Sequence, residues 1–419
     1  MKLSHPTTDL LACDGGKPVR ADPFPPWPVF DPTEIEAVAE VLRSGKVNYW
    51  TGCRGRQFEE QFARAANCQY GVAVSNGTVA LELALTALGV GPGDEVVVTC
   101  RSFVASASCC IARGAVPVFA DVDPDSQNIT VETVRAALTP RTRAIIAVHL
   151  AGWPCEMDPI AELAHQRGLA VIEDCAQAHG ATYRGRPVGS LGNVAAFSFC
   201  QDKILTTGGE GGMLTTDDRE TWERLWSLKD HGKGWQAMQR HAPPNVFHWV
   251  HESFGTNARM TEMQAALGLA MLPKLPEWVT TRRRNAAMLA GRLLEISALR
   301  VPVPPPEIGH SYYKFYAFLR PQRLRNGWTR DDVLAALRAE GIPCGSGICP
   351  EIYLEKAFEH SASRPAKRLP VARGLGQTSL MFLVHPTLGE PEMLDTCRAV
   401  EKVLHAAASR PVPITRRAA

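Results

Sequence analysis

Short β-branched and apolar runs alternate with helical stretches from about residue 70 onward, and this alternation restricts the fold more than any other feature of the chain. Such an alternation is typical of a sheet built through crossover helices. After Thr182 the rhythm changes to two strands joined by a glycine-rich turn. The pattern predicts the α/β class. We expect strands at 71–75, 95–99, 116–122, 143–149, 169–174, 194–200 and 212–216, with a helix after each of the first four.

The chain has 419 residues, which is enough for two or three packed units. A helical stretch over 261–296 contains Pro273 and Pro276 and should break or bend there. The Pro-rich segment 301–306 follows it and is typical of a domain junction. We therefore expect a large domain over residues 1–275 with an N-terminal arm, a smaller C-terminal α/β domain over 276–410, and a flexible tail over 411–419.

Composition excludes several classes of protein. The 45 Lys and Arg residues nearly balance the 43 Asp and Glu residues, and the densest basic cluster, at 282–284, lies in a helical pattern typical of a solvated face. We therefore expect no nucleic-acid partner. We also expect no membrane contact, because no signal peptide or transmembrane run is visible. The twelve cysteines form no zinc-ligand spacing, so we expect no metal and reduced thiols in a cytoplasmic protein.

The segment Ser75-Asn76-Gly77-Thr78 has the order that a phosphate-binding turn requires, because it leaves a strand and begins a helix. Backbone N–H groups and the positive end of the helix would face an anion there. The same residues also make a common turn and helix cap, so the structural interpretation stays open.

Two charged residues follow apolar strands further along the chain. Asp174 ends the strand 169–174, at the edge where open α/β sheets bind ligands, and a pyridinium nitrogen would be a suitable partner for its carboxylate. An N-cap role in the next helix is an equal alternative. Lys203 stands between a strand and a glycine-rich turn, where a desolvated amine could act as a nucleophile, although most lysines are solvated surface charges. The order of turn, acid and lysine is more informative than any one of them.

Several longer segments follow one another between GGKPVR at 15–20 and HPT at 385–387. With them the chain resembles the DegT/DnrJ/StrS sugar aminotransferases, a branch of the aspartate-aminotransferase-like, fold-type I enzymes that use pyridoxal 5′-phosphate (PLP). The resemblance implies a large α/β/α domain with a mostly parallel, mixed sheet and a smaller C-terminal α/β domain. The segments are SNGTVALELAL, DVDPDSQNIT, AVHLAGWPCEMDPI, VIEDCAQAHGA, AFSFCQDKILTTGGEGG and NARMTEMQAALG.

The resemblance also implies roles for single residues. Lys203 matches the Schiff-base lysine and Asp174 the acid that pairs with the pyridine nitrogen, so we expect both to be catalytic. Gln177 matches the residue beside the ring hydroxyl, and Phe103 matches the aromatic that stacks on the pyridine face. The phosphate would be held by Gly77, Thr78 and Ser198, and by Asn257 of the other subunit, which implies a homodimer with composite active sites.

The implied reaction moves an amino group from glutamate or glutamine to a nucleotide-linked ketosugar, for amino-sugar, cell-surface polysaccharide or secondary-metabolite biosynthesis. A keto-cyclitol of the inosose type is the alternative acceptor, because GGKPVR recurs in that branch without being confined to it. A PLP-dependent sugar dehydratase is a further alternative. Dehydratases of the same group carry histidine in place of the Schiff-base lysine, so the presence of Lys203 argues against this activity. A non-catalytic, PLP-binding regulator would need a DNA-binding module or a basic face, and the sequence shows neither. The tripeptide CQD before Lys203 and the segment NARM depart from the family pattern and weaken any choice of sugar.

Overall fold

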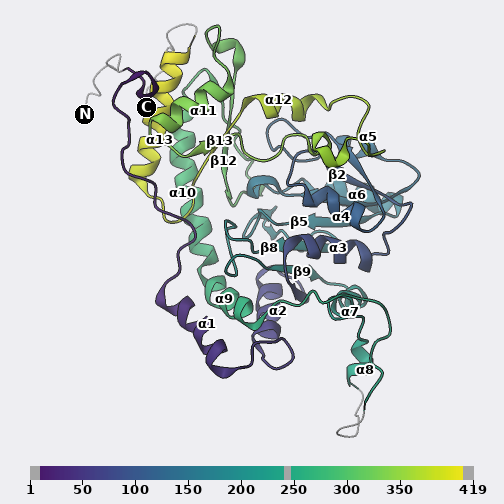
Figure 1. Cartoon of the computed structure of the whole chain (residues 1–419). Coiled ribbons are helices and arrows are strands. Elements are labelled where there is room, and N and C mark those ends of the chain that lie inside the picture. The colour runs from purple at the N-terminus through teal and green to yellow at the C-terminus, as the bar shows by residue number, and fades with distance from the viewer. Residues whose placement is uncertain (1–9, 240–246, 409–419) are drawn as a thin grey trace.

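The computed structural model describes residues 10–239 and 247–408, which form two α/β bodies, one around a seven-stranded sheet and one around a four-stranded sheet (Figure 1). Among the described residues, no helix combines the length and the apolar character needed to cross a membrane. The predicted tail over 411–419 lies outside the described residues.

The large sheet is mixed and mostly parallel, as predicted. Its strand order is β1-β9-β8-β5-β4-β2-β3, and only β9 runs antiparallel to both of its neighbours. The carboxyl ends of the parallel strands therefore meet at one edge. The strands are β1 (Tyr70–Val74), β2 (Glu95–Thr99), β3 (Val116–Ala120), β4 (Thr142–Val148), β5 (Ala170–Asp174), β8 (Val194–Ser198) and β9 (Gly212–Thr216).

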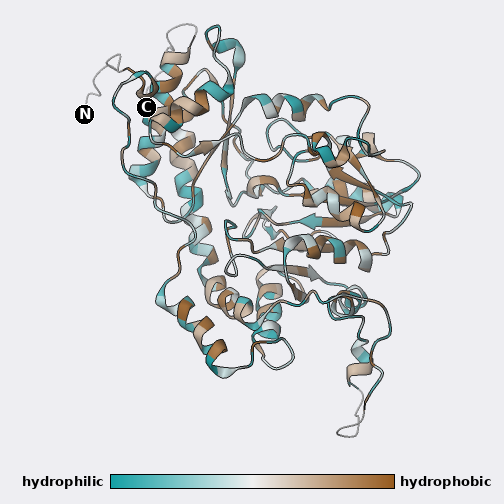
Figure 2. Cartoon of the chain, in the orientation of Figure 1, coloured by the Kyte–Doolittle hydropathy of each residue, from teal (hydrophilic) through white to brown (hydrophobic). Residues whose placement is uncertain are grey.

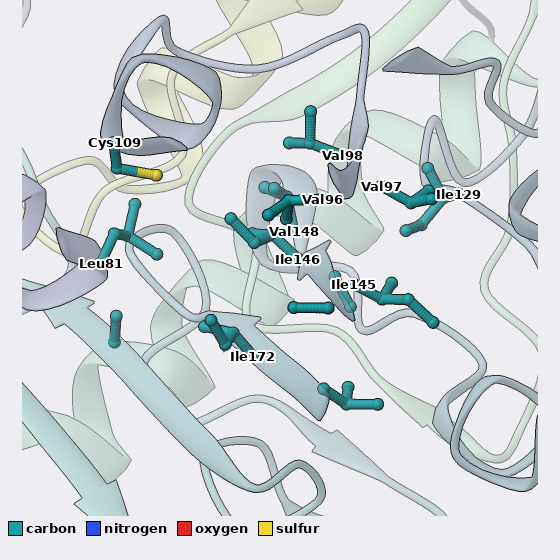
Figure 3. Packing of buried hydrophobic residues seen from close by; sticks show 14 of the residues in the cluster. Leu81, Val96, Val97, Val98, Cys109, Ile129, Ile145, Ile146, Val148 and Ile172 are labelled. Carbon is teal, nitrogen blue, oxygen red and sulfur yellow. The ribbon is translucent and has the colours of Figure 1, made fainter. Parts of the chain in front are cut away.

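Helices cover both faces of this sheet, because alternate residues of a strand point to opposite sides. Val194 and Ala196 of β8 belong to one apolar cluster, whereas Ala195 and Phe197 belong to another. In the first cluster, Leu81 and Cys109 pack over buried residues of β2, β4 and β5 (Figure 3). The helices are α1 (Pro32–Ser44), α2 (Arg54–Ala65), α3 (Gly77–Ala87), α4 (Ala105–Ala112), α5 (Val131–Ala137), α6 (Met157–Arg167), α7 (Arg219–Leu228), α8 (Trp235–Gln239) and α9 (Glu262–Met271).

The second body contains a small antiparallel sheet packed against long helices. The sheet has the order β10-β12-β14-β13, with β10 (Leu299–Arg300), β12 (Phe315–Leu319), β13 (Cys344–Gly345) and β14 (Ser379–Phe382). Its long helices carry both hydrophilic and hydrophobic residues (Figure 2), and their hydrophobic residues form one core with those of the strands. The helices are α10 (Leu275–Leu293), α11 (Arg330–Ala339), α12 (Pro370–Thr378) and α13 (Glu390–Ala407). A third, minor sheet joins β6 (Thr182–Tyr183), β7 (Arg186–Pro187) and β11 (Ile308–Gly309).

The two bodies are connected by helices that break where the prolines predict. Helix α9 ends at Met271, a 3-10 turn spans Leu272–Lys274, and α10 begins at Leu275, so Pro273 and Pro276 each stand in the first turn of an element. The N-terminal segment differs from the expected arrangement, because Leu11 is part of the apolar core of the second body, and Val19 and Phe24 pack against it. The segment 11–24 therefore packs with the second body.

Candidate active site

The predicted phosphate turn lies between β1 and α3 and is shaped for close approach of the backbone. Asn76 caps α3, because its side-chain oxygen accepts from the N–H of Val79 at 2.9 Å. A Cβ atom added to Gly77 would lie 2.6 Å from the Cβ of Ser198, so only glycine fits there. Gly77 and Ser198 are thus in direct contact, and the free N–H groups of the first helical turn can face an anion.

Asp174 ends β5 at the same edge of the sheet and is buried, with 5% of its surface exposed. Its carboxylate accepts from Ser106 Oγ at 2.8 Å and from the N–H of Ala176 at 3.1 Å. Burial raises the pKa of Asp174, and these hydrogen bonds and the charge of Lys203 offset that effect only in part. A cation placed against this carboxylate would stabilise its ionised form.

Gln177 and Phe103 flank this position from two loops. The side-chain oxygen of Gln177 accepts from the N–H of Ala151 at 2.8 Å, which fixes a buried amide beside the end of β5. Helix α4 begins at Ala105, so Phe103 stands before the helix in the loop after β2. With 60% of its surface exposed, Phe103 offers an aromatic ring that the core does not use.

Lys203 follows β8, which pairs in parallel with β5 and so brings the loop after Ser198 to the Asp174 edge. Its ammonium lies 4.9 Å from the centroid of the Tyr313 ring, and its backbone carbonyl accepts from Trp27 Nε1 at 2.9 Å. The N-terminal segment, through Trp27, and the second body, through Tyr313, thus both contact Lys203. They cover the side of the site that faces away from the large sheet.

A second lysine lies close to Lys203. The ammonium of Lys314, in the second body, lies 4.7 Å from the same Tyr313 ring and 3.8 Å from the carboxylate of Asp202. The Tyr313 hydroxyl donates to Asp202. Burial lowers the pKa of Lys314. A cavity of about 510 Å³ borders Asp202 and Lys314 and is also lined by Trp27 and His385. Two amines therefore share the Tyr313 ring, and of the two Lys203 follows the strand that pairs with β5.

Asn257 lies beside the phosphate turn of its own chain, but its side chain is exposed. The next residue, Ala258, accepts from the N–H of Ser75 at 2.8 Å, and Asn257 itself forms a β-bridge with Asp230. Nearby, Phe254 is almost fully exposed, and so is Trp249, on a segment that extends away from the body beside α8 (Figure 1). Large exposed aromatics of this kind are typical of an interaction surface.

Sequence reasoning missed two contacts of the site, those of Ser106 and Trp27. Ser106 lies three residues after Phe103 in α4, and its contact with Asp174 depends on how α4 packs against β5. Trp27 is 176 residues from Lys203 in the chain and carries no local signal of its role. Tyr49, in the segment SGKVNYWTG, is a core residue that is 3% exposed and donates to Glu59.

Comparison with known proteins agrees with this architecture. The sequence profile of the DegT/DnrJ/EryC1/StrS aminotransferase family matches residues 28–401. A UDP-N-acetyl-3-dehydro-α-D-glucosamine 3-aminotransferase of Acidithiobacillus ferrooxidans is 38% identical over 84% of this chain and 89% of its own length. An L-glutamine:2-deoxy-scyllo-inosose aminotransferase of Streptomyces fradiae is 37% identical over 94% of this chain and 97% of its own.

A solved structure supports the same assignment. The X-ray structure of the aminotransferase from Psychrobacter cryohalolentis superposes with a TM-score of 0.90 at 50% identity, over 92% of this chain and all of that one. Family profile, relatives and fold agree along nearly the whole sequence, and the predicted family and fold class are confirmed. The chain belongs to the DegT/DnrJ/EryC1/StrS aminotransferase family and is an aminotransferase.

Proposed function

We propose that this aminotransferase uses PLP to move an amino group from glutamate or glutamine to a nucleotide-linked ketosugar. The observation that carries the proposal is the meeting, at one edge of the large sheet, of a buried carboxylate and an amine. Asp174 ends β5, and Lys203 follows β8, the strand that pairs with β5 in parallel. The phosphate turn at Gly77 reaches the same edge through Ser198.

The residues fit the three recognisable parts of PLP. A pyridinium nitrogen would supply the cation that the buried Asp174 carboxylate lacks among its hydrogen-bond partners. The exposed ring of Phe103 and the fixed amide of Gln177 would contact the ring face and the ring hydroxyl. Gly77, Thr78 and Ser198 would hold the phosphate at the start of α3.

In transamination PLP withdraws electrons from the substrate α-carbon and carries the amino group between the two substrates. Lys203 would hold the aldehyde covalently and, once displaced by the donor, move a proton at the substrate carbon. Ser106 and the N–H of Ala176 hold the Asp174 carboxylate in one orientation. The hydrogen bond from Trp27 holds the backbone of Lys203 in place, so the side chain of Lys203 extends from a fixed position. The donor and acceptor would use the site in turn, which gives ping-pong kinetics.

The acceptor is proposed from the relatives. The Acidithiobacillus enzyme is named for a UDP-linked ketosugar, and a 37% identical relative from Caulobacter vibrioides is named GDP-perosamine synthase. The Streptomyces fradiae relative is named for an inosose, so a keto-cyclitol remains the alternative acceptor. The test is to incubate the enzyme with glutamate or glutamine and a panel of UDP-, GDP- and dTDP-ketosugars and keto-cyclitols, followed by mass spectrometry of the products. Amination of a nucleotide sugar supports the proposal, and amination of cyclitols alone contradicts it.

We further propose a homodimer in which Asn257 reaches the phosphate of the partner subunit's site. Its exposed side chain and the exposed aromatics nearby support this arrangement. The test mixes the two inactive or weakened variants Lys203→Ala and Asn257→Ala under conditions that exchange subunits. If Asn257 acts across the interface, each mixed dimer has one intact site and activity rises above that of either variant alone. If Asn257 acts within its own chain, mixing gives no gain.

The close contact at Gly77 predicts the effect of a larger residue on cofactor binding. In Gly77→Val, the new Cβ would press on Ser198 and displace the start of α3 from the phosphate position. We expect the Kd for PLP to rise at least about 10-fold, because a loss near 1.4 kcal/mol suffices. Titration of the apoenzyme by visible absorbance measures it. Gly291→Val, at an exposed glycine of α10 where an added Cβ meets no atom within 4 Å, is the matched control, and equal PLP affinity in both variants would contradict the prediction.

A further inference from the structure

Glu173 precedes Asp174 on β5 and points to the opposite face of the sheet. It is completely buried, yet no lysine or arginine pairs with it among the described residues. Its carboxylate instead receives four hydrogen-bond donors. Oε1 accepts from the N–H groups of Leu191 and Gly192 at 2.7 and 2.9 Å. Oε2 accepts from the N–H of Gly189 and faces His149 Nε2, both at 3.0 Å.

The tautomer of His149 follows from its second nitrogen. Nδ1 accepts from the backbone N–H of Cys155 at 3.0 Å, so the proton of the neutral ring lies on Nε2 and is donated to Glu173. Burial alone would raise the pKa of Glu173, but the hydrogen bonds from His149 and from the backbone N–H groups outweigh burial and lower it. Glu173 is therefore an ionised group held entirely by hydrogen bonds.

A metal site is the first alternative, because one ligand atom each of His149, Glu173 and Cys175 lie within 4.8 Å of one another. The hydrogen bonds argue against it. Nδ1 of His149 is occupied by a backbone donor, and each oxygen of Glu173 already accepts two. Burial raises the pKa of the Cys175 thiol well above its usual value, which keeps it protonated. The trio is better explained as a hydrogen-bonded support than as a ligand set.

This support connects three backbone segments that carry the site. The N–H of His149 donates to the carbonyl of Asp174 at 3.1 Å, which ties the end of β4 to the acid. The donors at Gly189 and Gly192 belong to the loop that leads into β8 and hence toward Lys203. Gly192 packs so closely that an added Cβ would lie 2.8 Å from the carbonyl of Val171. One carboxylate therefore sets the relative positions of β4, β5 and the start of β8.

We propose that Glu173 is a positioning residue for transamination, acting through Asp174 and β8 to hold the acid and the lysine in register. The proposal rests on the roles assigned to Asp174 and Lys203 above. It requires that both oxygens of Glu173 accept hydrogen bonds, because each has two donors. A displacement of either strand end by a fraction of an ångström would misalign groups that must act on one substrate carbon.

Glu173→Gln is the most direct test, because in either orientation of the glutamine amide its NH₂ group, itself a donor, faces two other donors. If its NH₂ group replaces Oε1, it faces the N–H groups of Leu191 and Gly192; if it replaces Oε2, it faces Gly189 and His149. In PLP-loaded enzyme of equal occupancy, we expect kcat to fall about 10-fold or more with the donor KM within about twofold. The pH midpoint of the visible absorbance of the bound cofactor should fall, because an anion that stabilises nearby cations is lost.

The absorbance readout separates positioning from stability. Burial raises the pKa values of the nearby thiols of Cys68, Cys155 and Cys175, so these thiols stay neutral. The negative charge that Glu173→Gln removes is therefore that of Glu173 itself. Glu340→Gln is the matched control: Glu340 is equally buried, accepts from the N–H groups of Ala12 and Val19, and pairs with Lys402 in the second body. We expect it to lower the melting temperature without moving kcat or the absorbance midpoint.

Two further variants keep the test decisive if Glu173→Gln does not fold. His149→Phe removes one of the four donors and should give a smaller change in the same direction, whereas His149→Gln can both accept from Cys155 and donate to Glu173 and should restore kcat. Unchanged kcat and midpoint in folded Glu173→Gln, or no difference between the two His149 variants, would overturn the proposal. A wild-type enzyme without visible cofactor absorbance or transamination would instead contradict the proposed function.

Discussion

Replacing Lys203 by alanine is expected to reduce transamination by at least about 10⁴-fold, which is the upper range for a positioned general acid–base. The loss corresponds to about 5.5 kcal/mol of transition-state stabilisation. The reason is that the amine both holds the aldehyde and moves the proton, and no backbone group can replace it. PLP should still bind, because the phosphate turn at Gly77 and the acid at Asp174 are unchanged. Single-turnover reaction of PLP-loaded enzyme with glutamate or glutamine measures the effect.

The control for this variant is Lys314→Ala. Lys314 lies over the same Tyr313 ring as Lys203, so its removal changes the local charge to a similar extent. We expect the Lys314 variant to retain the covalent link to PLP and the Lys203 variant to lose it. Rapid single turnover by Lys203→Ala would show that another group moves the proton.

Asp174→Asn is expected to slow proton transfer by about 10²- to 10³-fold, the range for removal of a preorganised electrostatic partner. Asparagine has the same shape and can still accept from Ser106, but it leaves the ring nitrogen of PLP without an anion in a buried site. Burial already raises the pKa of Asp174, so the ionised carboxylate depends on the cation opposite it. Stopped-flow absorbance with the donor gives the rate.

Ser106→Ala separates the charge of Asp174 from its orientation. This variant removes one hydrogen bond at 2.8 Å and leaves the carboxylate in place. We expect a loss of less than about 10-fold, in keeping with a net hydrogen-bond contribution near 1 kcal/mol. An Asp174→Asn rate equal to that of the wild type would make Asp174 a structural cap of the following turn and not the partner of PLP.

The sequence was sufficient to place the strands of the large sheet, because β-branched runs and the residues that punctuate them are local signals. Val96 to Val98 and Ile145 to Ile146 read as buried strands and are buried. The break between α9 and α10 was predictable for the same reason, since proline excludes the helical hydrogen bond wherever it stands.

Contacts between distant segments were not predictable in this way. Ser106 reaches Asp174 across 68 residues, and Trp27 reaches Lys203 across 176, so both depend on tertiary packing that no local pattern encodes. The N-terminal arm is rich in proline and lacks periodicity, which is why its packing against the second body could not be anticipated. The role of Glu173 was not predictable either, because its four donors come from the residue after β4 and from a distant loop.

The amine that binds the cofactor can be identified directly. Borohydride reduction of the PLP-loaded enzyme, followed by proteolysis and mass spectrometry, fixes the cofactor to one lysine. We predict that the labelled peptide contains Lys203. Label on Lys314, the amine that shares the Tyr313 ring, would contradict the assignment of Lys203 and the pairing with Asp174 that depends on it.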